Sequence, residues 1–557
     1  MKNYIKKYPV ITIIFFVSLV CTGAFYEYYS CAFSVLLLIF LIWKVRKEKQ
    51  FCFYRNSTSI AVIGMLALYL FSILWAIDSG MAFLGVFKFL PVALYLIVLM
   101  QEKDCREKTI NIIPYVVSVL TILSIIGMLI PVLESKFTVA GRLAGFYQYP
   151  NTFALLLLAA EIVLLEKNRY GLIDCVTLVM LITGLLLTGS RTVFVLAVIA
   201  NLILILTNSN KKVRLIGMSL IGLGVVGIAV YAFLFGGASV IERYMSISLT
   251  ESTFVGRVLY FIDALPTILK NPFGLGYMGY YYIQQSIQTG LYSVRYIHND
   301  WLQMMLDVGW IPCILFIIAI VKTVLNNGTT LHRKVILIVM FLHSCFDFNL
   351  QFISMFWLFI LFMDYEAGKE NVVRCKKKGI VWCFCVIICF CLYVGTSLIL
   401  FQAEKYDWVL KIYPWNTQAA TYQLTKIDDI NKAAELADEI LLRNEYVTLA
   451  YTVKARQAYS KGDFANVIAF KNELLDRAPF QYEEYEEYCY MLFTGINLYT
   501  KSGDSYSADI CKKELIKVSQ RLEQAEKKIS KLGKMIKDQP ITELPENIQN
   551  YIGSIKN

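Results

Sequence analysis

The chain of 557 residues is 57% hydrophobic and only 17% charged, and its formal net charge is +11. An average soluble domain is about 45–50% apolar and about 25% charged. A soluble globule of this length could not bury so much apolar surface, and the composition also excludes a disordered, fibrous or disulfide-stapled chain. We therefore expect an all-α, multi-pass membrane protein.

The charge is divided unevenly along the chain. Residues 402–557 hold 21 Lys and Arg against 23 Asp and Glu, which leaves 32 and 19 for residues 1–401. The first part therefore carries +13 and the second part −2. This division predicts a basic polytopic membrane domain over 1–401 and a near-neutral soluble domain over 402–557.

Apolar runs long enough to cross a bilayer recur through the first 401 residues. We predict about thirteen crossings, near residues 8–24, 30–43, 59–76, 81–100, 110–132, 152–165, 171–188, 191–207, 214–235, 301–321, 335–346, 350–363 and 379–401. Basic residues flank the stretch 335–363 on both sides, which predicts a hairpin of two short helices that turns near Asp347.

Positive charges predict the orientation, because cytoplasmic loops of membrane proteins are rich in Lys and Arg. With the N-terminus in the cytoplasm, the inner segments hold 24 of the 32 cations of the membrane part. Thirteen crossings then place residues 402–557 outside the cytoplasm. The sequence has 14 Cys and three His, but no metal-ligand spacing, so we expect no metal site.

The tail predicts a helical repeat. From residue 415 onward, amphipathic helices alternate with short breaks. The segment AYSKGDFANVIAFKNELLDRAP, residues 458–479, has the turn, the periodicity and the terminal Pro of a tetratricopeptide repeat, and a step of 34 residues pairs Asp463 with Asp429. A plain helical bundle is the alternative. Either form is a binding module, and we expect the stretch after Lys527 to be a solvated end.

Few cations fall on the predicted outer side of the membrane part. They are Lys136, Arg142, Arg191, Arg243, Arg257, Lys270 and Arg295. Five of these seven are Arg, whose planar guanidinium grips phosphate with paired hydrogen bonds. Snorkelling to lipid phosphates is the alternative for any one of them, but several together near a His favour a functional site.

Two segments place titratable groups near this outer face. The largest outer loop, about 236–300, ends in RYIHNDWLQMMLDVGW, so His298 begins a helix and could act as a general base, or the segment could simply cap the helix. In HSCFDFNLQF, His343 and Asp347 are four residues apart and share a helix face if the helix continues. Lys88 lies inside a span and could face a cavity or pair structurally.

Five segments together resemble the O-antigen ligase and polymerase superfamily, membrane glycosyltransferases that act on lipid-linked sugars. The segments are GRLAGFYQYPNTFA, LTGSRTVFVLAVIA, GRVLYFIDALPTILKNPFGLGYMGY, HNDWLQMMLDVGW and HSCFDF, in family order. The resemblance implies a helical fold related to polyprenyl-dependent glycosyltransferases, with a core at about 140–365. It implies an oligosaccharide donor on a polyprenyl diphosphate, at the outer face of a bacterial cytoplasmic membrane, and no cofactor or metal.

The resemblance also implies roles for single residues. Arg191 and Arg257 look like the pair that binds the diphosphate, and Arg142 looks like a supporting cation. His298 looks like the base that deprotonates the acceptor hydroxyl, and Asp347 like the acidic residue near the end of the family pattern. Further supporting residues would be Arg295, Asp300, Asp307 and Lys88. Many members carry Glu where this chain has Asp307, which leaves the role of this position open.

The acceptor stays open at this point. Another lipid-linked repeat would make the protein a polymerase, a lipid core a ligase, and a Ser, Thr or Tyr side chain a protein O-oligosaccharyltransferase. A flippase or other transporter of lipid-linked glycans is an alternative of another class, and a non-catalytic scaffold is a third. The expected partners are the lipid-linked oligosaccharide, a glycan, lipid or protein acceptor, membrane lipids and a protein bound by the tail, but no nucleic acid.

Overall fold

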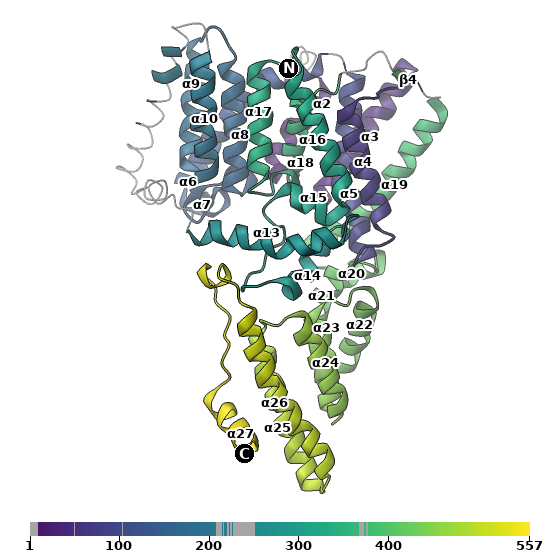
Figure 1. The fold of residues 1–557 in the computed structure, drawn as a ribbon. Helices are drawn as coiled ribbons and strands as arrows, with labels where there is room; N and C mark the ends of the chain where they lie inside the picture. The colour runs from purple at the N-terminus through teal and green to yellow at the C-terminus, as the bar shows by residue number, and fades with distance from the viewer. Residues whose placement is uncertain are drawn as a thin grey trace.

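The computed structural model describes residues 9–49, 51–102, 104–207, 251–366 and 377–556, with 214–215, 217–219, 222, 226 and 372–374 between them. It has an upright bundle of helices, a layer of helices across one end of the bundle, and a C-terminal arm, residues 402–556, that extends away from that end (Figure 1). We call this end the arm end. Most of the predicted crossing at 214–235 and all of the first part of the predicted loop, 236–250, lie outside the described residues.

Apolar helices form the upright bundle. They are α2 (Val10–Val20), α3 (Glu27–Glu48), α4 (Ser57–Ser72), α5 (Ser79–Gln101), α6 (Cys105–Leu129), α8 (Pro150–Leu165), α9 (Leu172–Leu187), α10 (Arg191–Thr207), α16 (Trp310–Leu325), α17 (Leu331–Ser344), α18 (Ile353–Phe362) and α19 (Lys377–Gln402). Among the described helices, α3, α5, α6 and α19 are upright and long and apolar enough to cross a membrane. The coarse prediction of a mostly helical, multi-pass chain is thus confirmed.

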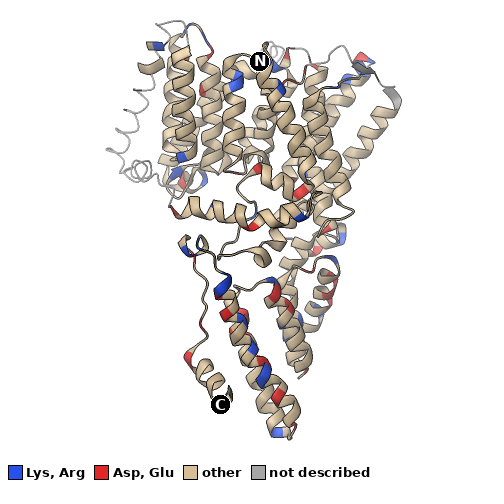
Figure 2. Cartoon of the chain, viewed as in Figure 1, with Lys and Arg blue, Asp and Glu red and all other residues tan. Residues whose placement is uncertain are grey.

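The centre of the bundle is buried on every side. All ten residues of α18 are buried, and α8 is buried apart from Asn151. A helix that is apolar all round belongs in a core rather than at a surface. Figure 2 shows charged residues at the two ends of the bundle and along the arm, with mostly uncharged residues along the middle of the upright helices. This distribution fits a bilayer around the bundle.

The predicted crossing at 301–321 is wrong as a single helix. It consists of α15 (Asp300–Val308) and α16, and Gly309 separates them with a φ of 83°. A Cβ at Gly309 would lie 2.1 Å from the carbonyl oxygen of Pro272. Glycine is required at this break because the neighbouring backbone lies so close and φ is positive.

A horizontal layer covers the arm end of the bundle. It contains α7 (Pro131–Phe137), α13 (Ser252–Lys270) and α14 (Gly279–Ile287). Helix α13 is long and apolar enough to span a membrane, but it lies across the bundle axis (Figure 1). The described part of the predicted outer loop is therefore a structured layer that carries Arg257 over the end of the bundle.

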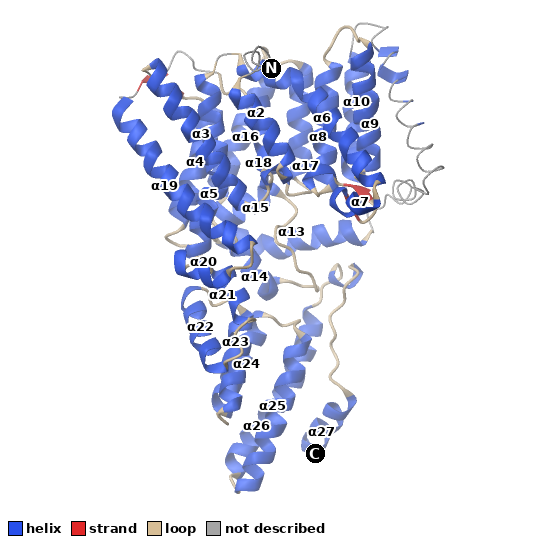
Figure 3. Ribbon diagram, turned by 180° about the vertical axis from the view of Figure 1, so that it is seen from behind, coloured by secondary structure: helices blue, strands red, loops and turns tan. Residues whose placement is uncertain are grey.

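Strands are a minor element of the described chain. β1 (Cys52–Tyr54) pairs antiparallel with β4 (Val372–Arg374), and β2 (Thr138–Val139) pairs antiparallel with β3 (Arg142–Leu143). Figure 3 shows how little of the ribbon they make up. The second pair matters for the site, because it fixes the backbone at Arg142 beside the arm end.

Paired helices build the arm. They are α20 (Tyr406–Ile412), α21 (Thr417–Leu424), α22 (Ile430–Arg443), α23 (Thr448–Ser460), α24 (Phe464–Arg477), α25 (Tyr482–Ser502), α26 (Ser505–Lys528) and α27 (Glu546–Lys556). Asp429 and Asp463, 34 residues apart in the sequence, both cap a helix with their carboxylate. The repeating helices agree with the predicted period, and their assignment as tetratricopeptide repeats stays a prediction.

The prediction of a solvated end after Lys527 is wrong. Ile536 packs with Val255 and Leu259 of α13, and the Ser530 backbone N–H donates to the Thr289 carbonyl at 2.9 Å. Farther along, Ile548 is fully buried in the core of the arm. The sequence pattern failed because the scattered apolar residues here dock against other elements instead of forming a core of their own.

We expect Lys471→Met to destabilise the α24–α25 pair by about 3–5 kcal/mol, the cost of breaking a buried ion pair by removing one partner. The Lys471 side chain is 0% exposed and pairs with Glu484 at 2.5 Å and with Glu487. Without the Lys471 ammonium, the carboxylates of Glu484 and Glu487 lie close together with no positive charge between them. Hydrogen exchange of peptides from 464–502 in the full chain measures the effect, and adding Glu484→Gln should restore part of it.

The same pair gives a pH dependence. Burial raises the pKa of the Glu487 carboxyl, but the hydrogen bonds and charges of Lys471 and Arg456 outweigh burial. The net effect is a pKa below the usual Glu value. The contribution of Glu487 to stability is therefore complete above the ordinary Glu pKa and is lost as the pH falls through its lowered pKa.

The matched control for Lys471→Met is Lys513→Met, at an exposed i,i+4 pair. It should change the hydrogen-exchange protection little.

Candidate active site

A buried carboxylate is the centre of a polar cluster at the arm end. Asp347 lies in the turn between α17 and the 3₁₀ turn η3 (Asn349–Gln351), and its side chain is 0% exposed. The Tyr149 hydroxyl donates to its Oδ1 at 2.7 Å, and the Asn151 Nδ2 donates to its Oδ2 at 2.7 Å. Both donors flank Pro150, the first residue of α8, so this helix start aims them at the carboxylate.

Two cationic or protonatable groups complete the cluster. Arg257, from α13, donates from Nη2 to Asp347 Oδ2 at 3.4 Å and from Nη1 to the Phe346 carbonyl at 2.7 Å. His298 Nδ1 lies 3.3 Å from Asp347 Oδ1. The structure thus brings together three of the predicted residues, His298, Arg257 and Asp347, from three separate segments.

The electrostatics keep Asp347 charged. Burial alone would raise the pKa of its carboxyl, but the Arg257 charge and the hydrogen bond with His298 outweigh burial and hold this pKa well below its usual range. An ionised Asp347 can accept a hydrogen bond from the Nδ1–H of His298. In that neutral tautomer the other ring nitrogen, Nε2, has the lone pair that a general base requires.

The backbone at His298 is held in an uncommon conformation. Its φ is 57°, and the next residue, Asn299, caps α15 by accepting from two backbone N–H groups. The ring lies between Phe348, with centroids 4.8 Å apart, and Tyr260, at 6.2 Å, and its side chain is 22% exposed. Positive φ at a non-glycine residue is typical of functional sites that are fixed by their surroundings.

Arg142 joins the cluster through Asn151. Its Nη2 donates to Asn151 Oδ1 at 2.7 Å, and its Nε donates to the carbonyl of Thr188 at 2.7 Å. Thr188 belongs to the LTGSR segment that ends in Arg191. One polar chain therefore runs from Arg142 through Asn151 to Asp347.

Arg191 lies at the start of α10 and pairs with Glu251, the residue before α13. Arg191 thereby contacts the N-terminal end of α13, the helix that carries Arg257. We find no direct contact between Arg191 and Asp347 among the described atoms. Arg191 and Arg257 are linked through α13, rather than by a shared partner.

Arg295 and Lys88 belong to a different charge cluster, around Glu27. Arg295 Nη2 lies 2.7 Å from Glu27 Oε1, which also accepts from the Tyr277 hydroxyl at 2.5 Å. Lys88 is fully buried in α5 and donates to the carbonyl of Phe25. This cluster fixes the loop before His298 to the start of α3, so both cations have a structural explanation.

The two acidic residues of α15 are buried and paired. Asp300 Oδ2 accepts from the Leu350 N–H at 3.0 Å, which ties the helix start to the turn after Asp347. Asp307 accepts from Gln303 at 2.9 Å and from the Tyr69 hydroxyl at 3.0 Å. Asp300 thus supports the turn, and Asp307 holds helices together away from the cluster.

The condition under which His343 and Asp347 would share a helix face, a helix that continues to Asp347, is not met. Helix α17 ends at Ser344, and His343 Nδ1 instead lies 2.8 Å from Asn349 Nδ2. Sequence reasoning also missed Tyr149 and Asn151, although both lie in the segment GRLAGFYQYPNTFA that contains Arg142. Their position around Pro150 at a helix start was the feature that could have identified them.

A match to a known family covers the middle of the chain. Residues 176–317 match the family model described as O-antigen ligase. The chain contains an O-antigen ligase domain. This domain makes the protein an enzyme of the glycosyltransferase type, and with the apolar helices it indicates a membrane protein of surface polysaccharide assembly with a lipid-linked glycan substrate. No curated protein and no solved structure matches the chain.

The O-antigen ligase domain holds Arg191, Arg257 and His298, whereas Arg142 and Asp347 lie outside the matched residues. The cluster therefore joins residues from within and beyond the domain. Within the described chain, no group of three His, Cys, Asp or Glu side chains could hold a metal ion. Any metal-independent chemistry at this site would rest on Arg, His and Asp side chains.

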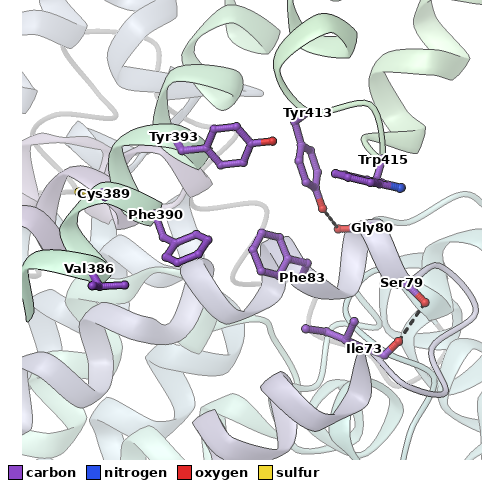
Figure 4. Close-up of a pocket in the computed structure, with 10 residues that line it drawn as sticks. All are labelled: Ile73, Ser79, Gly80, Phe83, Val386, Cys389, Phe390, Tyr393, Tyr413 and Trp415. Carbon is purple, nitrogen blue, oxygen red and sulfur yellow. Dashed lines mark hydrogen bonds between the residues drawn. The ribbon is translucent and has the colours of Figure 1, made fainter. Parts of the chain in front are cut away.

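A large apolar pocket lies elsewhere. It has a volume of about 780 Å³ and is lined by residues of α4, α5, α19 and the start of the arm, among them Phe83, Phe390 and Trp415. In Figure 4, Tyr413 closes one side by donating to the Gly80 carbonyl at 2.8 Å. None of its lining residues belongs to the Asp347 cluster, so size alone does not mark this pocket as the place of reaction.

Proposed function

We propose that the protein transfers or polymerises an oligosaccharide from a polyprenyl-diphosphate carrier at the outer face of a bacterial cytoplasmic membrane. The observation that carries the proposal is the contact of His298 and Arg257 with one buried carboxylate, Asp347, at the end of a helical bundle. In this proposal the N-terminus is cytoplasmic, and the arm end and the arm lie outside. The membrane fold would be related to polyprenyl-dependent glycosyltransferases.

The residue types suit a displacement at an anomeric carbon. His298 Nε2 takes the proton of the acceptor hydroxyl, whose oxygen forms a bond to the anomeric carbon as the bond from that carbon to the diphosphate oxygen breaks. Attack from the opposite face inverts the configuration. The products are the extended glycan and the polyprenyl diphosphate, and no other reactant is needed.

The Arg side chains would stabilise the leaving diphosphate. A guanidinium has five N–H donors, and Arg257 uses two of them on Asp347 and Phe346. The others can reach phosphate oxygens, with Arg191 and Arg142 adding positive charge from the same end of the bundle. Fixed charges at a desolvated site are worth more than in water.

The test is a transfer assay with purified protein in nanodiscs, using lipid-linked oligosaccharide extracted from producing cells as the donor. We expect release of polyprenyl diphosphate with transfer of an intact oligosaccharide. Glycan analysis of a deletion strain then assigns the acceptor: short uncapped repeats mean a polymerase, unattached long chains a ligase, and bare proteins a protein O-oligosaccharyltransferase. Movement of donor across the membrane without transfer would instead mean a flippase.

We expect Asp347→Asn to lower kcat by about 10- to 100-fold, by analogy with the loss seen when a partner that orients a metal-bound His is removed. The amide no longer fixes the His298 tautomer and leaves the Arg257 charge unpaired. The nanodisc assay measures kcat, with Asp509→Asn on the exposed face of α26 as the control. A wild-type kcat in Asp347→Asn would remove Asp347 from the mechanism.

A further inference from the structure

A groove runs between the arm-end layer and the arm. One part, of about 300 Å³, lies between α14 and the helices α21 and α23, and is lined by Tyr281 and Tyr422 among others. A second part, of about 430 Å³, lies between the loop after α14 and the start of α25, and includes Tyr482. The two parts share Gln285 and Ser293. Each has a volume typical of a small-molecule site.

The lining of the groove is largely uncharged and combines apolar surface with amide and hydroxyl groups. Tyr and Gln dominate it, no Lys or Arg lines either part, and the charged lining residues are Glu483 and Asp538, both in the second part. A Gln amide both donates and accepts hydrogen bonds. A Tyr side chain offers an apolar face and a hydroxyl. This set suits a neutral ligand rich in hydroxyl groups and disfavours a phosphate or another anion.

Several polar atoms of the groove walls lack partners. Tyr282 Oη, Gln288 Oε1 and Gln481 Oε1 are buried and form no hydrogen bond with any residue in the described part of the chain. Buried polar atoms in folded proteins are nearly always paired. These three atoms are therefore candidate partners for the hydroxyl groups of a ligand in the groove.

Two packed aromatic rings separate the second part of the groove from His298. The ring of Tyr292, which lines its second part, packs on Tyr260 with centroids 4.4 Å apart, and the same Tyr260 ring lies 6.2 Å from that of His298. Ser293, where the two parts meet, is five residues before His298 in the same loop. The second part of the groove therefore lies only two ring contacts away from the proposed base.

We propose that this groove binds a neutral stretch of glycan adjacent to the sugar that reacts at His298, a role that rests on the proposed function. The arm would then be a wall of the substrate site, and not a separate docking module. The short separation from His298 and the lack of Lys and Arg in the lining favour a glycan over a peptide. The bound sugars belong either to the donor or to the acceptor, and the experiment separates these sources.

The experiment compares Gln285→Ala and Tyr422→Ala with their matched controls Gln520→Ala and Tyr506→Ala, which lie exposed on α26. Full-length protein in nanodiscs is assayed with donors and acceptors of one and of several repeats. We expect KM to rise about 3- to 10-fold for the long substrate that occupies the groove, the cost of one lost contact. KM for single repeats, kcat and both controls should stay unchanged.

A direct binding measurement keeps the result independent of turnover. The probe is labelled multi-repeat glycan, released by mild acid from the lipid-linked pool and titrated onto the full chain. We expect saturable binding that both groove variants weaken and both controls retain. Binding unaffected by Gln285→Ala and Tyr422→Ala would overturn the groove assignment, even in a protein that transfers normally. Saturation instead by a Ser- and Thr-containing peptide, lost in the same variants, would assign the groove to a protein acceptor.

Failure of the groove proposal and failure of the proposed transferase function give different results. A wild-type chain that binds glycan in the groove but never transfers it would contradict the transferase role of His298 and leave the groove standing as a glycan site. A wild-type chain that transfers glycan, with groove variants that keep every KM and every affinity, would refute the groove and leave the transferase standing.

Discussion

His298→Ala is expected to lower kcat for glycan transfer by about 10²- to 10⁴-fold, the contribution of a positioned general base. The reason is geometric. Asp347 contacts Nδ1 of the ring, which leaves Nε2 for the acceptor proton in the proposed mechanism, and the rings of Phe348 and Tyr260 flank it. Alanine leaves in place the Arg side chains that we propose bind the diphosphate, so donor affinity should change little. Single-turnover transfer in nanodiscs separates the two quantities.

The control for this variant is His332→Ala. His332 lies in the first turn of α17, at the end of the bundle away from the arm, whereas Asp347 follows the opposite end of this helix. It should transfer at the wild-type rate. Added imidazole should restore part of the activity of His298→Ala, because a small base can enter the space that the ring leaves. Undiminished transfer by His298→Ala would disprove the role of His298 as the base.

Hydropathy predicted the bundle well because a bilayer imposes one strong requirement. A segment that crosses it must be a run of apolar residues whose backbone N–H and C=O groups are hydrogen-bonded within the helix. The runs at 81–100 and 191–207 nearly coincide with α5 and α10. The break at Gly309 was not predictable in this way, since it depends on the backbone of Pro272, 37 residues earlier in the chain.

The candidate site was predictable in part. Charge asymmetry selected the cations at one end of the bundle, and the family resemblance assigned roles to some of them. Which cations meet depends on tertiary partners that no local pattern reveals: Arg257 reaches Asp347, whereas Arg295 pairs with Glu27. Tyr149 and Asn151 carry no net charge, so charge counting passed over the two closest donors to Asp347.

The arm illustrates a different failure. The period of 34 residues predicted equivalent helix starts at Asp429 and Asp463, because capping is a local property. The packing of Ile536 on α13 is a contact between regions almost 300 residues apart. Through this contact the end of the arm supports the helix that carries Arg257.

Arg257→Ala is expected to lower kcat by about 10²- to 10³-fold, the cost of removing one fixed donor from a developing negative charge. The loss should fall on kcat more than on donor KM, because the charge on the diphosphate grows as the anomeric bond breaks. Arg257→Lys should recover little of it. A Lys ammonium is a point donor and cannot reproduce the contacts to Asp347, Phe346 and a phosphate at the same time.

The matched control is Arg456→Ala, an exposed arginine of the arm that pairs with Glu487, and it should leave kcat unchanged. A second donor with a better leaving group, such as an oligosaccharide fluoride, sharpens the test. Fluoride departs without a diphosphate, so the difference between wild type and Arg257→Ala should shrink with this donor, while that between wild type and His298→Ala should persist. An equal loss with both donors would show that Arg257 acts on the fold or on His298 rather than on the leaving group.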